Sequence, residues 1–383
     1  MIYLDWAATA VPDSALMDEL VSIETELYGN PSSLHAEGKR ARMLLEECRG
    51  RTAGTLELDP STLYFTSGGT ESNGVVLTSL LFRRKRSGMV ISGIEHPSVW
   101  ETAKHLKELG CPVKTVKANP SGHIDPDTIA SAIDDETGLV AVMAVSNDTG
   151  AVQPLKSIVH AVRDRERDRG GRIHIHTDAV QALGKIPFDP ISLGVDSAAF
   201  SGHKIGAPRG IGMLYLAKPL KTLLAGGEQE GGIRPGTENL RGILGITLAV
   251  ERRAAAFEEL FEHGRRLERR IIRAVEEEPS VKLIGDYERG DGYSPWIVTV
   301  SIPPIPGEVL VRIMSDRGFA VSTGSACSAA KAARTRSLEN MGIDKKTAFS
   351  AIRVSTGPAT TDEDIDEFLR VLFKESALLV KSL

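Results

Sequence analysis

The sequence has few cysteines and no long hydrophobic run. Its 383 residues include 3 cysteines, too few for a disulfide framework, and this favours the reducing cytoplasm over a secreted location. No apolar stretch approaches the roughly 20 residues that a membrane span requires. The chain enters a strand-like segment at residues 1–5 without a basic and then apolar stretch, so we see no secretory signal. We therefore expect a cytoplasmic protein without a membrane segment.

The charge balance is also modest. The chain has 46 Lys and Arg against 51 Asp and Glu, and the formal net charge of −5 argues against wholesale binding to nucleic acid. Hydrophobic residues make up 41% and charged residues 25% of the chain, as in ordinary globular proteins. A length of 383 residues exceeds the size at which a single core stops growing, so we expect two domains. We predict no metal site.

Helical and strand-like patterns alternate from about residue 13 to about residue 249. Residues 37–58 have helical periodicity, whereas 139–145 form a continuous apolar run that is typical of a strand buried on both faces. Such alternation predicts a mainly parallel sheet covered by helices. Because ligands bind at the carboxyl ends of the strands in such sheets, we expect Asn147, Asp178 and Lys204 to gather there.

The carboxyl-terminal third has a different pattern. A charged helix is predicted at about 250–278, and shorter strand and helix patterns follow it. These patterns are typical of a smaller α+β unit. We therefore predict an α/β protein with a large domain at 13–250 and a small domain formed by residues 1–12 and 251–383.

The cysteines differ in their surroundings. Cys327 lies in a run of small residues, 321–330, where a thiol is poorly placed to fill a core and is open to a reactive role. Cys48 lies in an apolar-periodic run and Cys111 begins a strand-like segment, so we expect both to be small hydrophobic residues of the core.

Three further features point to a phosphate-bearing cofactor. Lys204 follows a strand-like segment, Asp178 follows another, and the glycine-rich segment 66–74 opens a predicted helix. Pyridoxal phosphate needs a phosphate cradle, an acidic partner for its pyridine nitrogen and a lysine for its aldehyde. The sequence therefore favours pyridoxal 5'-phosphate. From the residues alone, Asp178 as a helix cap and Lys204 as a surface lysine remain alternatives.

In these segments the chain resembles the cysteine desulfurases of the nitrogen-fixation and iron–sulfur-cluster type, which are class-V aminotransferases and fold type I pyridoxal-phosphate enzymes. The resemblance runs nearly end to end, and its blocks occur in the family's order: residues 3–9, 29–35, 66–73, 95–96, 147–150, 177–181, 201–204, 234–237 and 322–327. It implies an aminotransferase-like fold, a sulfurtransferase activity and pyridoxal phosphate as cofactor.

The resemblance also implies residue roles at the cofactor. Lys204 would hold it in a Schiff base and move the substrate Cα proton, while Asp178 would pair with the pyridine nitrogen. Gln181 would bond the phenolic oxygen, and His96 would stack on the ring and assist proton transfers, although a core histidine is the alternative from the residue alone. The phosphate would be held by Gly69, Thr70, Ser201 and His203, and by Thr237 of the neighbouring subunit. A homodimer with shared active sites follows from this last role.

The same resemblance implies L-cysteine as substrate. Asn147 and Arg353 match positions that bind its α-carboxylate, with a surface ion pair as the alternative for Arg353. The Cys327 thiolate would attack the substrate sulfur, leaving alanine and a persulfide on Cys327. The sulfur would then pass to an acceptor protein, a scaffold or a sulfurtransferase, for iron–sulfur cluster assembly, thio-cofactors or tRNA thiolation.

Some segments depart from the family pattern. Asp148 replaces the usual glutamate, and residues 331–336 read Lys-Ala-Ala-Arg-Thr-Arg where many relatives have an apolar and acidic stretch. The sulfur acceptor is therefore left open. Two other functions also stay open: a selenocysteine or cysteine lyase that works without Cys327, and a weakly active, cofactor-bound docking scaffold.

Overall fold

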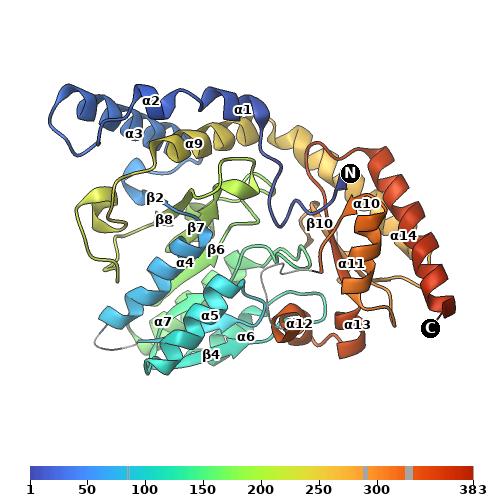
Figure 1. Ribbon diagram of the computed structural model, residues 1–383. Coiled ribbons are helices and arrows are strands. Elements are labelled where there is room, and N and C mark those ends of the chain that lie inside the picture. The colour runs from blue at the N-terminus through green and yellow to red at the C-terminus, as the bar shows by residue number, and fades with distance from the viewer. Residues whose placement is uncertain (84, 86, 288–291, 324–330, 383) are drawn as a thin grey trace.

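The computed structural model describes residues 1–83, 85, 87–287, 292–323 and 331–382. These residues form a large β-sheet, a small three-stranded sheet and a separate pair of strands, with helices around them (Figure 1). Within these residues the large sheet has seven strands in the order β2-β8-β7-β6-β5-β3-β4. Its strands are β2 (Leu63–Thr66), β3 (Gly88–Ser92), β4 (Val113–Val116), β5 (Thr137–Ala141), β6 (His174–Asp178), β7 (Ser197–Ser201) and β8 (Gly212–Leu216).

Strands β4, β3, β5, β6 and β7 of the large sheet run parallel, and β8 runs antiparallel to both β7 and β2. Successive residues of the central strands enter opposite cores: Val90 and Val140 pack on one side, Met89 and Leu139 on the other. Both faces are therefore buried, as the continuous apolar run predicted. The mainly parallel α/β sheet is confirmed.

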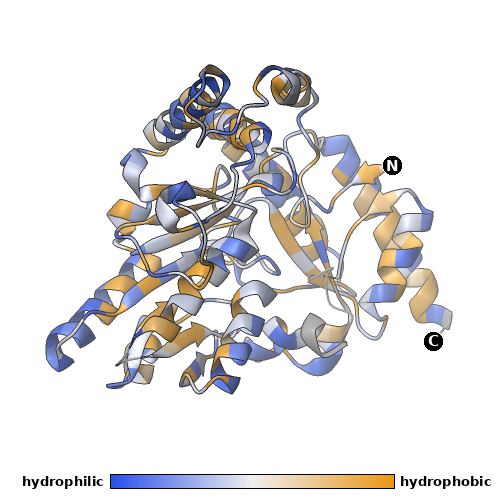
Figure 2. Ribbon diagram, turned by 60° about the vertical axis from the view of Figure 1, so that its left-hand side comes forward, coloured by the Kyte–Doolittle hydropathy of each residue, from blue (hydrophilic) through white to orange (hydrophobic). Residues whose placement is uncertain are grey.

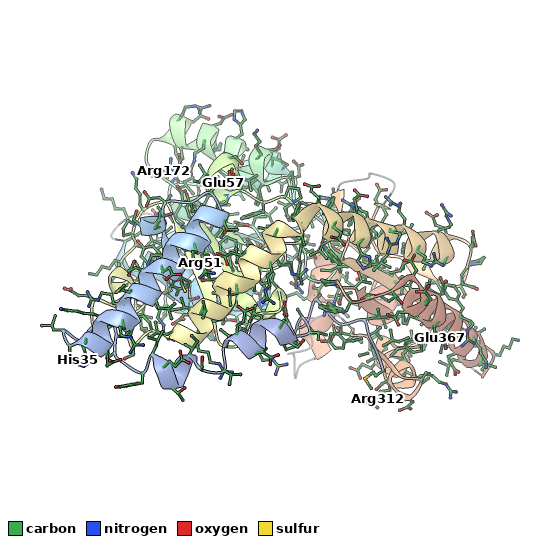
Figure 3. All side chains as sticks on the ribbon, turned by 90° about the horizontal axis from the view of Figure 1, so that it is seen from above. His35, Arg51, Glu57, Arg172, Arg312 and Glu367 are labelled. Carbon is green, nitrogen blue, oxygen red and sulfur yellow. The ribbon has the colours of Figure 1, made fainter. Side chains whose placement is uncertain are left out.

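Helices cover both faces of the large sheet. The core on one side includes residues of α3 (Ala36–Thr55), α7 (Leu155–Arg169) and α9 (Leu240–Ala255), and that on the other includes residues of α4 (Gly69–Thr78) and α5 (Pro97–Glu108). The shorter helices in this part are α1 (Ser14–Glu19), α2 (Ile23–Glu26), α6 (Pro126–Ala132) and α8 (Pro190–Leu193). Helices α3 and α9 lie side by side, and Figure 3 shows Arg51 of α3 beside α9, where it pairs with Glu251 at 2.7 Å. Between these helices, Thr52 and Thr247 share a buried hydrogen bond of 2.9 Å.

The small sheet has a core of its own. Strands β12 (Ala351–Ser355), β10 (Ile297–Ser301) and β9 (Lys282–Leu283) pair antiparallel, and β1 (Ile2–Tyr3) pairs in parallel with β11 (Phe319–Ala320). Helices α10 (Phe257–Glu276), α11 (Gly307–Asp316) and α14 (Asp362–Ser382) bury residues such as Ile271, Leu310 and Phe368 against it. Helices α12 (Lys331–Asn340) and α13 (Lys345–Phe349) precede β12. Figure 2 shows hydrophobic and hydrophilic residues alternating along α14, as expected for a helix with one buried face.

The amino-terminal segment joins the two sheets. Leu4 N donates to Ala320 O at 2.8 Å and Ala7 N donates to Ser355 Oγ at 2.9 Å, both in the small-sheet region. Ala10 N then donates to His203 O at 2.9 Å beyond the end of β7. The Trp6 ring lies against Gly357, where a Cβ atom would come within 2.1 Å of it, so a residue with a side chain does not fit there. Residues 4–10 are thus held across the edge of the large sheet.

Two local predictions need correction. The charged helix predicted at 250–278 is the end of α9 and the whole of α10, with a break at Ala256 (φ −104°, ψ 13°) that contains no Gly or Pro to mark it. The strand predicted at 139–145 ends at Ala141, although residues 142–145 remain buried. The prediction was too long because a continuous apolar run indicates that residues are buried and does not show that they pair in a sheet. The separate cores support two domains, and the predicted domain boundaries stay a prediction. No helix in the described ranges is both long and apolar enough to cross a membrane.

Candidate functional site

A cavity of about 270 Å³ lies at the carboxyl ends of the central strands. Ten of the twelve site residues predicted from the sequence line it: Gly69, Thr70, His96, Asn147, Asp178, Gln181, Ser201, His203, Lys204 and Arg353. Ala7 and Ala8 of the amino-terminal segment complete one wall. The topology explains the gathering, because parallel strands deliver the residues that follow them to one edge of the sheet.

One end of the cavity is suited to an anion. Helix α4 begins at Gly69 directly after β2, so backbone N–H groups of its first turn point toward the cavity end. A Cβ atom on residue 69 would lie 2.6 Å from Val180 Cγ2, which explains the glycine at this close approach. Thr70, Ser201 and His203 line the same cavity, and burial lowers the pKa of His203 to about 4, helped by neighbouring Lys204.

A buried carboxylate lies at the end of β6. Asp178 is 5% exposed, and its two oxygens accept hydrogen bonds from Asn73 Nδ2 at 2.7 Å and from Val180 N at 3.0 Å. It is therefore a buried acceptor at the cavity, and its bond from Val180 N is a local contact of the kind that a helix cap makes. Asn73 was not predicted as a site residue, although it falls in the segment that carried the resemblance.

Lys204 follows β7 in a short 3-10 turn, η3 (Gly202–Lys204). Its Nζ donates to Ala7 O and Ala8 O, at 2.7 Å each. The amino-terminal segment thus brings two backbone carbonyls to this amine, and the surface-lysine alternative does not apply. Ala7 and Ala8 fall in a segment of resemblance, but neither was predicted to have a role of its own.

Gln181 links the same carbonyl to a second lysine. Its Nε2 donates to Ala7 O at 2.9 Å, and its Oε1 accepts from Lys185 Nζ at 2.6 Å. Lys185 is 7% exposed, and burial lowers its pKa well below the usual value, with Lys204, Arg253 and Arg353 adding to the effect. Sequence reasoning missed Lys185, because a lysine is normally exposed and no local pattern marks this one as buried.

His96 caps the amino end of α5. Its Nδ1 accepts from Ser98 N at 3.2 Å and lies 2.8 Å from Ser98 Oγ, and Pro97 occupies the first helical turn. Burial lowers the pKa of His96; the Asp178 charge acts against this shift and Lys204 adds to it. The ring is therefore held at the cavity wall by its own helix start.

Arg353 reaches the cavity from the small sheet. It is 3% exposed, its Nη1 donates to Asn147 O at 2.8 Å and its Nη2 to Asp5 Oδ1 at 2.9 Å. Within the described residues, Arg353 Nε and Asn147 Oδ1 are buried without a hydrogen-bond partner. These open polar atoms can take a small polar ligand. Arg353 does form an ion pair, but a buried one, and Asp5 as its partner was not predicted.

Two predicted residues are not placed in the cavity. Thr237 lies before α9, where its carbonyl accepts from Arg234 Nη1 at 3.5 Å, and it does not line the cavity within this single chain. Cys327 lies outside the described residues, so its position relative to Lys204 is left open. Cys48 and Cys111 are buried free thiols, as expected of core residues.

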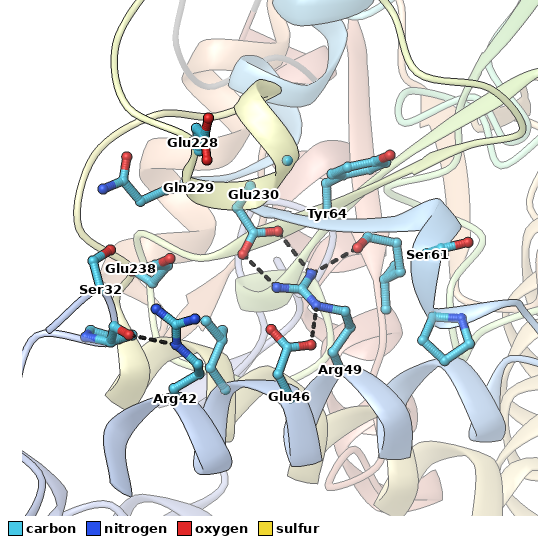
Figure 4. A pocket seen from close by; sticks show the side chains of 15 residues that line it. Ser32, Arg42, Glu46, Arg49, Ser61, Tyr64, Glu228, Gln229, Glu230 and Glu238 are labelled. Atoms are coloured by element: carbon cyan, nitrogen blue, oxygen red, sulfur yellow. Dashed lines mark hydrogen bonds and ion pairs between the residues drawn. The ribbon is translucent and has the colours of Figure 1, made fainter. Parts of the chain in front are cut away.

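A larger cavity, of about 850 Å³, lies elsewhere, between α3 and residues 228–238 (Figure 4). In its wall, Arg49 makes two hydrogen bonds to Glu230, 2.8 and 2.9 Å long. Glu230 also accepts from Phe65 N at 2.7 Å. None of the residues that line it matches a predicted site residue, so its size alone does not make it the reaction site.

The residues of the smaller cavity fit pyridoxal phosphate. An anion-binding helix start, a carboxylate and an amine lie around one cavity, and these are the three groups that the phosphate, pyridine nitrogen and aldehyde need. The open Arg353 Nε, a donor, adds a place for a carboxylate, whereas the open Asn147 Oδ1 can only accept a hydrogen bond. No group of three or more metal-ligating side chains occurs in the described part of the chain.

Comparison with known proteins adds independent findings. The profile of the family described as aminotransferase class-V matches residues 2–368. The NifS/IcsS protein homolog of Lactobacillus delbrueckii subsp. bulgaricus is 34% identical over 374 residues, 96% of this chain and 95% of its own. The cysteine desulfurase IscS of Clostridium botulinum is 33% identical over 378 residues, 97% of this chain and 94% of its own. A solved NifS-like protein superposes with a TM-score of 0.90 at 33% identity, covering 98% of this chain and 99% of that one.

Proposed function

The chain belongs to the class-V aminotransferase family and is a pyridoxal-phosphate-dependent cysteine desulfurase, and from this premise we propose how its own residues carry the reaction. The observation that carries the proposal is the meeting of Lys204, Asp178, His96 and Arg353 around one cavity at the strand ends. Its fold is that of the fold type I enzymes to which these relatives belong.

We propose that the cofactor lies between α4 and β6. Gly69 and Thr70 at the start of α4, with Ser201 and His203, bind the phosphate. Asp178 accepts a hydrogen bond from the pyridine nitrogen, Gln181 donates to the phenolic oxygen and His96 stacks on the ring. When bound, the cofactor supplies an aldehyde for amines and a ring that takes up electrons from the substrate Cα.

Lys204 has two roles in this proposal: it holds the cofactor aldehyde and it removes the substrate Cα proton. A lysine acts as a base only when it is neutral. The carbonyls of Ala7 and Ala8, at 2.7 Å from Nζ, hold the amine at the cavity wall when it is not bonded to the cofactor. Removal of this amine is expected to stop both steps.

L-cysteine is the substrate of this family, and we propose that its carboxylate binds at Arg353 and Asn147. Arg353 already uses Nη1 and Nη2 in the protein, which fixes the plane of its guanidinium group, and Nε remains open. Asn147 Nδ2 donates one proton to Asp148 Oδ1 at 2.9 Å and has a second for the substrate. A fixed guanidinium group can orient a planar carboxylate. The substrate Cα is then held within reach of Lys204.

We propose Cys327 as the sulfur acceptor. Its thiolate attacks the sulfur of the bound substrate, so that the new S–S bond forms as the C–S bond breaks. The substrate carbon keeps the electron pair and takes up a proton, which gives alanine and a persulfide on Cys327. An acceptor protein or a small thiol then removes the outer sulfur.

A homodimer with shared sites is also part of the proposal. Thr237 does not line the cavity of its own chain, so its phosphate contact requires a second subunit. Exposed apolar side chains lie on two segments at the left of Figure 1, around α2 and α3 and between β8 and α9: Tyr28, Leu34, Met43, Leu223 and Leu224. Contact between two such surfaces would bury these side chains, which favours association. A cytoplasmic location agrees with the two free thiols, Cys48 and Cys111.

The test follows sulfur directly. The purified holoenzyme is incubated with L-cysteine without reductant, alanine is measured, and Cys327 is examined by peptide mass spectrometry. We expect alanine and one added sulfur on Cys327. Cys327→Ser keeps the visible absorption of the cofactor but makes no alanine, Lys204→Ala loses both, and Cys111→Ser controls for loss of another thiol.

Other results would contradict parts of the proposal. Alanine without modified Cys327, or full turnover of selenocysteine by Cys327→Ser, would indicate a lyase. Bound cofactor without any product would favour the docking scaffold. An active Lys204→Ala enzyme would overturn the assignment of the lysine.

A further inference from the structure

The side chain of Asn73 forms hydrogen bonds to Asp178, to Ser98 and to His176. It lies on α4 with no exposed surface, and its Nδ2 lies 2.7 Å from Asp178 Oδ2 and 2.8 Å from Ser98 Oγ. At the other end of its amide, Oδ1 lies 2.9 Å from His176 Nε2. One buried side chain thus bonds to residues of β6 and α5 at once.

The orientation of this amide follows from its neighbours. An ionised carboxylate oxygen accepts and does not donate, so the amide end that faces Asp178 is the NH₂ group. The reverse orientation would place Asn73 Oδ1 2.7 Å from Asp178 Oδ2, so that two buried acceptors would face each other. The two protons of the NH₂ group then go to Asp178 and to Ser98, and the oxygen faces His176.

The histidines behind Asn73 fit this orientation. Burial lowers the pKa of His176 to about 3 and that of His174 to about 4, so both rings are neutral. Because Asn73 Oδ1 accepts, His176 carries its proton on Nε2, and its Nδ1 accepts from Ser197 Oγ at 2.8 Å. The Ser197 proton is then used, so His174 Nε2, at 2.7 Å, donates to the same oxygen. In this series of hydrogen bonds from Asn73 to His174, each shared proton is thus assigned to one donor atom.

A second branch of hydrogen bonds runs from Asn73 through Ser98 to His96. Ser98 Oγ accepts from Asn73, so its own proton can go to His96 Nδ1 at 2.8 Å. Ser98 N also donates to this Nδ1, at 3.2 Å. With two donors on Nδ1, a neutral His96 carries its proton on Nε2.

We propose that Asn73 is a positioning residue that orders both groups flanking the cofactor, Asp178 as acceptor and His96 with its proton on Nε2. This inference rests on the proposed function, which places Asp178 and His96 at the cofactor ring. Asn73 itself does not line the cavity, so it acts through these neighbours.

The experiment reads the two branches separately. Holoenzymes with ¹⁵N-labelled histidine are compared by NMR, which reports the tautomer of His96, and by the visible absorption of the cofactor, which reports the Asp178 side. We expect Asn73→Leu to change both signals and to lower kcat about ten- to a hundredfold, the range for loss of a hydrogen bond to a charged group. Ser98→Ala should change the His96 signal and leave the absorption maximum in place.

Thr247→Val is the matched control, because it removes a buried hydrogen bond between α3 and α9, outside the site. It should leave both signals and kcat unchanged. If Asn73→Leu does not fold, Asn73→Asp, which keeps the shape but loses the amide donors, is judged by the same two signals. Wild-type signals in the Asn73 variant, a change on one branch alone, or equal changes in Thr247→Val would overturn the inference. Failure of the proposed function would appear differently, as wild-type enzyme without alanine or sulfur on Cys327.

Discussion

Asp5 and Arg353 lie 348 positions apart in the sequence and form an ion pair, with Arg353 Nη2 2.9 Å from Asp5 Oδ1. The pair joins the amino-terminal segment to β12. Its arginine side chain is 3% exposed and its aspartate 18%. The guanidinium group that we propose for substrate binding is therefore oriented by an acid from the other end of the chain.

Removal of Asp5 should affect both stability and substrate binding. Leaving one partner of a buried ion pair alone costs about 3 kcal/mol or more, so we expect Asp5→Ala to lower the free energy of unfolding by about that amount. The KM for L-cysteine should rise on the order of tenfold, because Arg353 is no longer held in one orientation. Denaturant unfolding and steady-state kinetics measure the two effects. Glu101→Ala, which breaks an exposed pair with Lys104, should cost less than about 1 kcal/mol, and equal losses would contradict the prediction.

Lys185 predicts a stability that rises with pH. Its pKa in the folded protein lies well below 10.5, the usual value for a lysine in an unfolded chain. At a pH between the folded and the unfolded pKa, the unfolded chain therefore binds a proton that the folded protein does not. Stability therefore increases as the pH rises, by up to about 1.4 kcal/mol per pH unit. Lys185→Met has no titrating amine at this position, so its free energy of unfolding should not rise with pH for this reason. Urea unfolding should therefore show that the free energy of unfolding of Lys185→Met, relative to that of the wild type, falls from pH 7 to pH 9. Lys156→Met, at an exposed lysine, controls for the lost charge, and a constant difference for Lys185→Met would refute the effect.

Glu95 predicts the opposite slope. It is 1% exposed, and burial raises its pKa to about 8 from 4.5, partly offset by hydrogen bonds from Ser92 and Met143. Between pH 4.5 and about 8 the folded protein holds a proton that the unfolded chain releases, so the wild type should lose stability as the pH rises through this window. Glu95→Gln, which resembles the protonated form, should flatten the curve by up to about 1.4 kcal/mol per pH unit. The free energy of unfolding is measured at pH 5, 6.5 and 8, with Glu108→Gln as the control at an exposed position. The same dependence of this free energy on pH in Glu95→Gln and in the wild type would contradict the prediction.

Shared active sites predict rescue by subunit mixing. If Thr237 completes the phosphate site of the neighbouring subunit, Thr237→Ala and Lys204→Ala homodimers should both be impaired. A mixed dimer of the two variants contains one site with intact Lys204 and intact Thr237, so its activity should recover to about half that of the wild type. Desulfuration is measured after unfolding and refolding an equal mixture, in which about half of the dimers are mixed, so the whole sample should reach about a quarter of the wild-type activity. Native mass spectrometry of the mixture, with one variant carrying a mass tag, shows whether mixed dimers form. Mixed dimers without recovered activity would contradict the shared site.

Much of the site could be predicted from the sequence. The alternation of helical and strand-like patterns predicted the parallel sheet, and chain order then placed Asp178 and Lys204 at the same edge. This works because strand ends are local features, and because one phosphate-bearing cofactor requires a small set of residue types at them. The same information located Gly69 at a helix start.

The tertiary structure decided which neighbours these residues have. Sequence alone did not show that Asp5 pairs with Arg353, that Lys185 is buried against Gln181, or that Asn73 joins Asp178 to Ser98. Each of these contacts depends on burial or on the meeting of distant segments, and neither leaves a periodic signal in the chain. The residue types of the site were set by the sequence, whereas the orientation of its charged and polar groups was set by how the two sheets and the amino-terminal segment pack together.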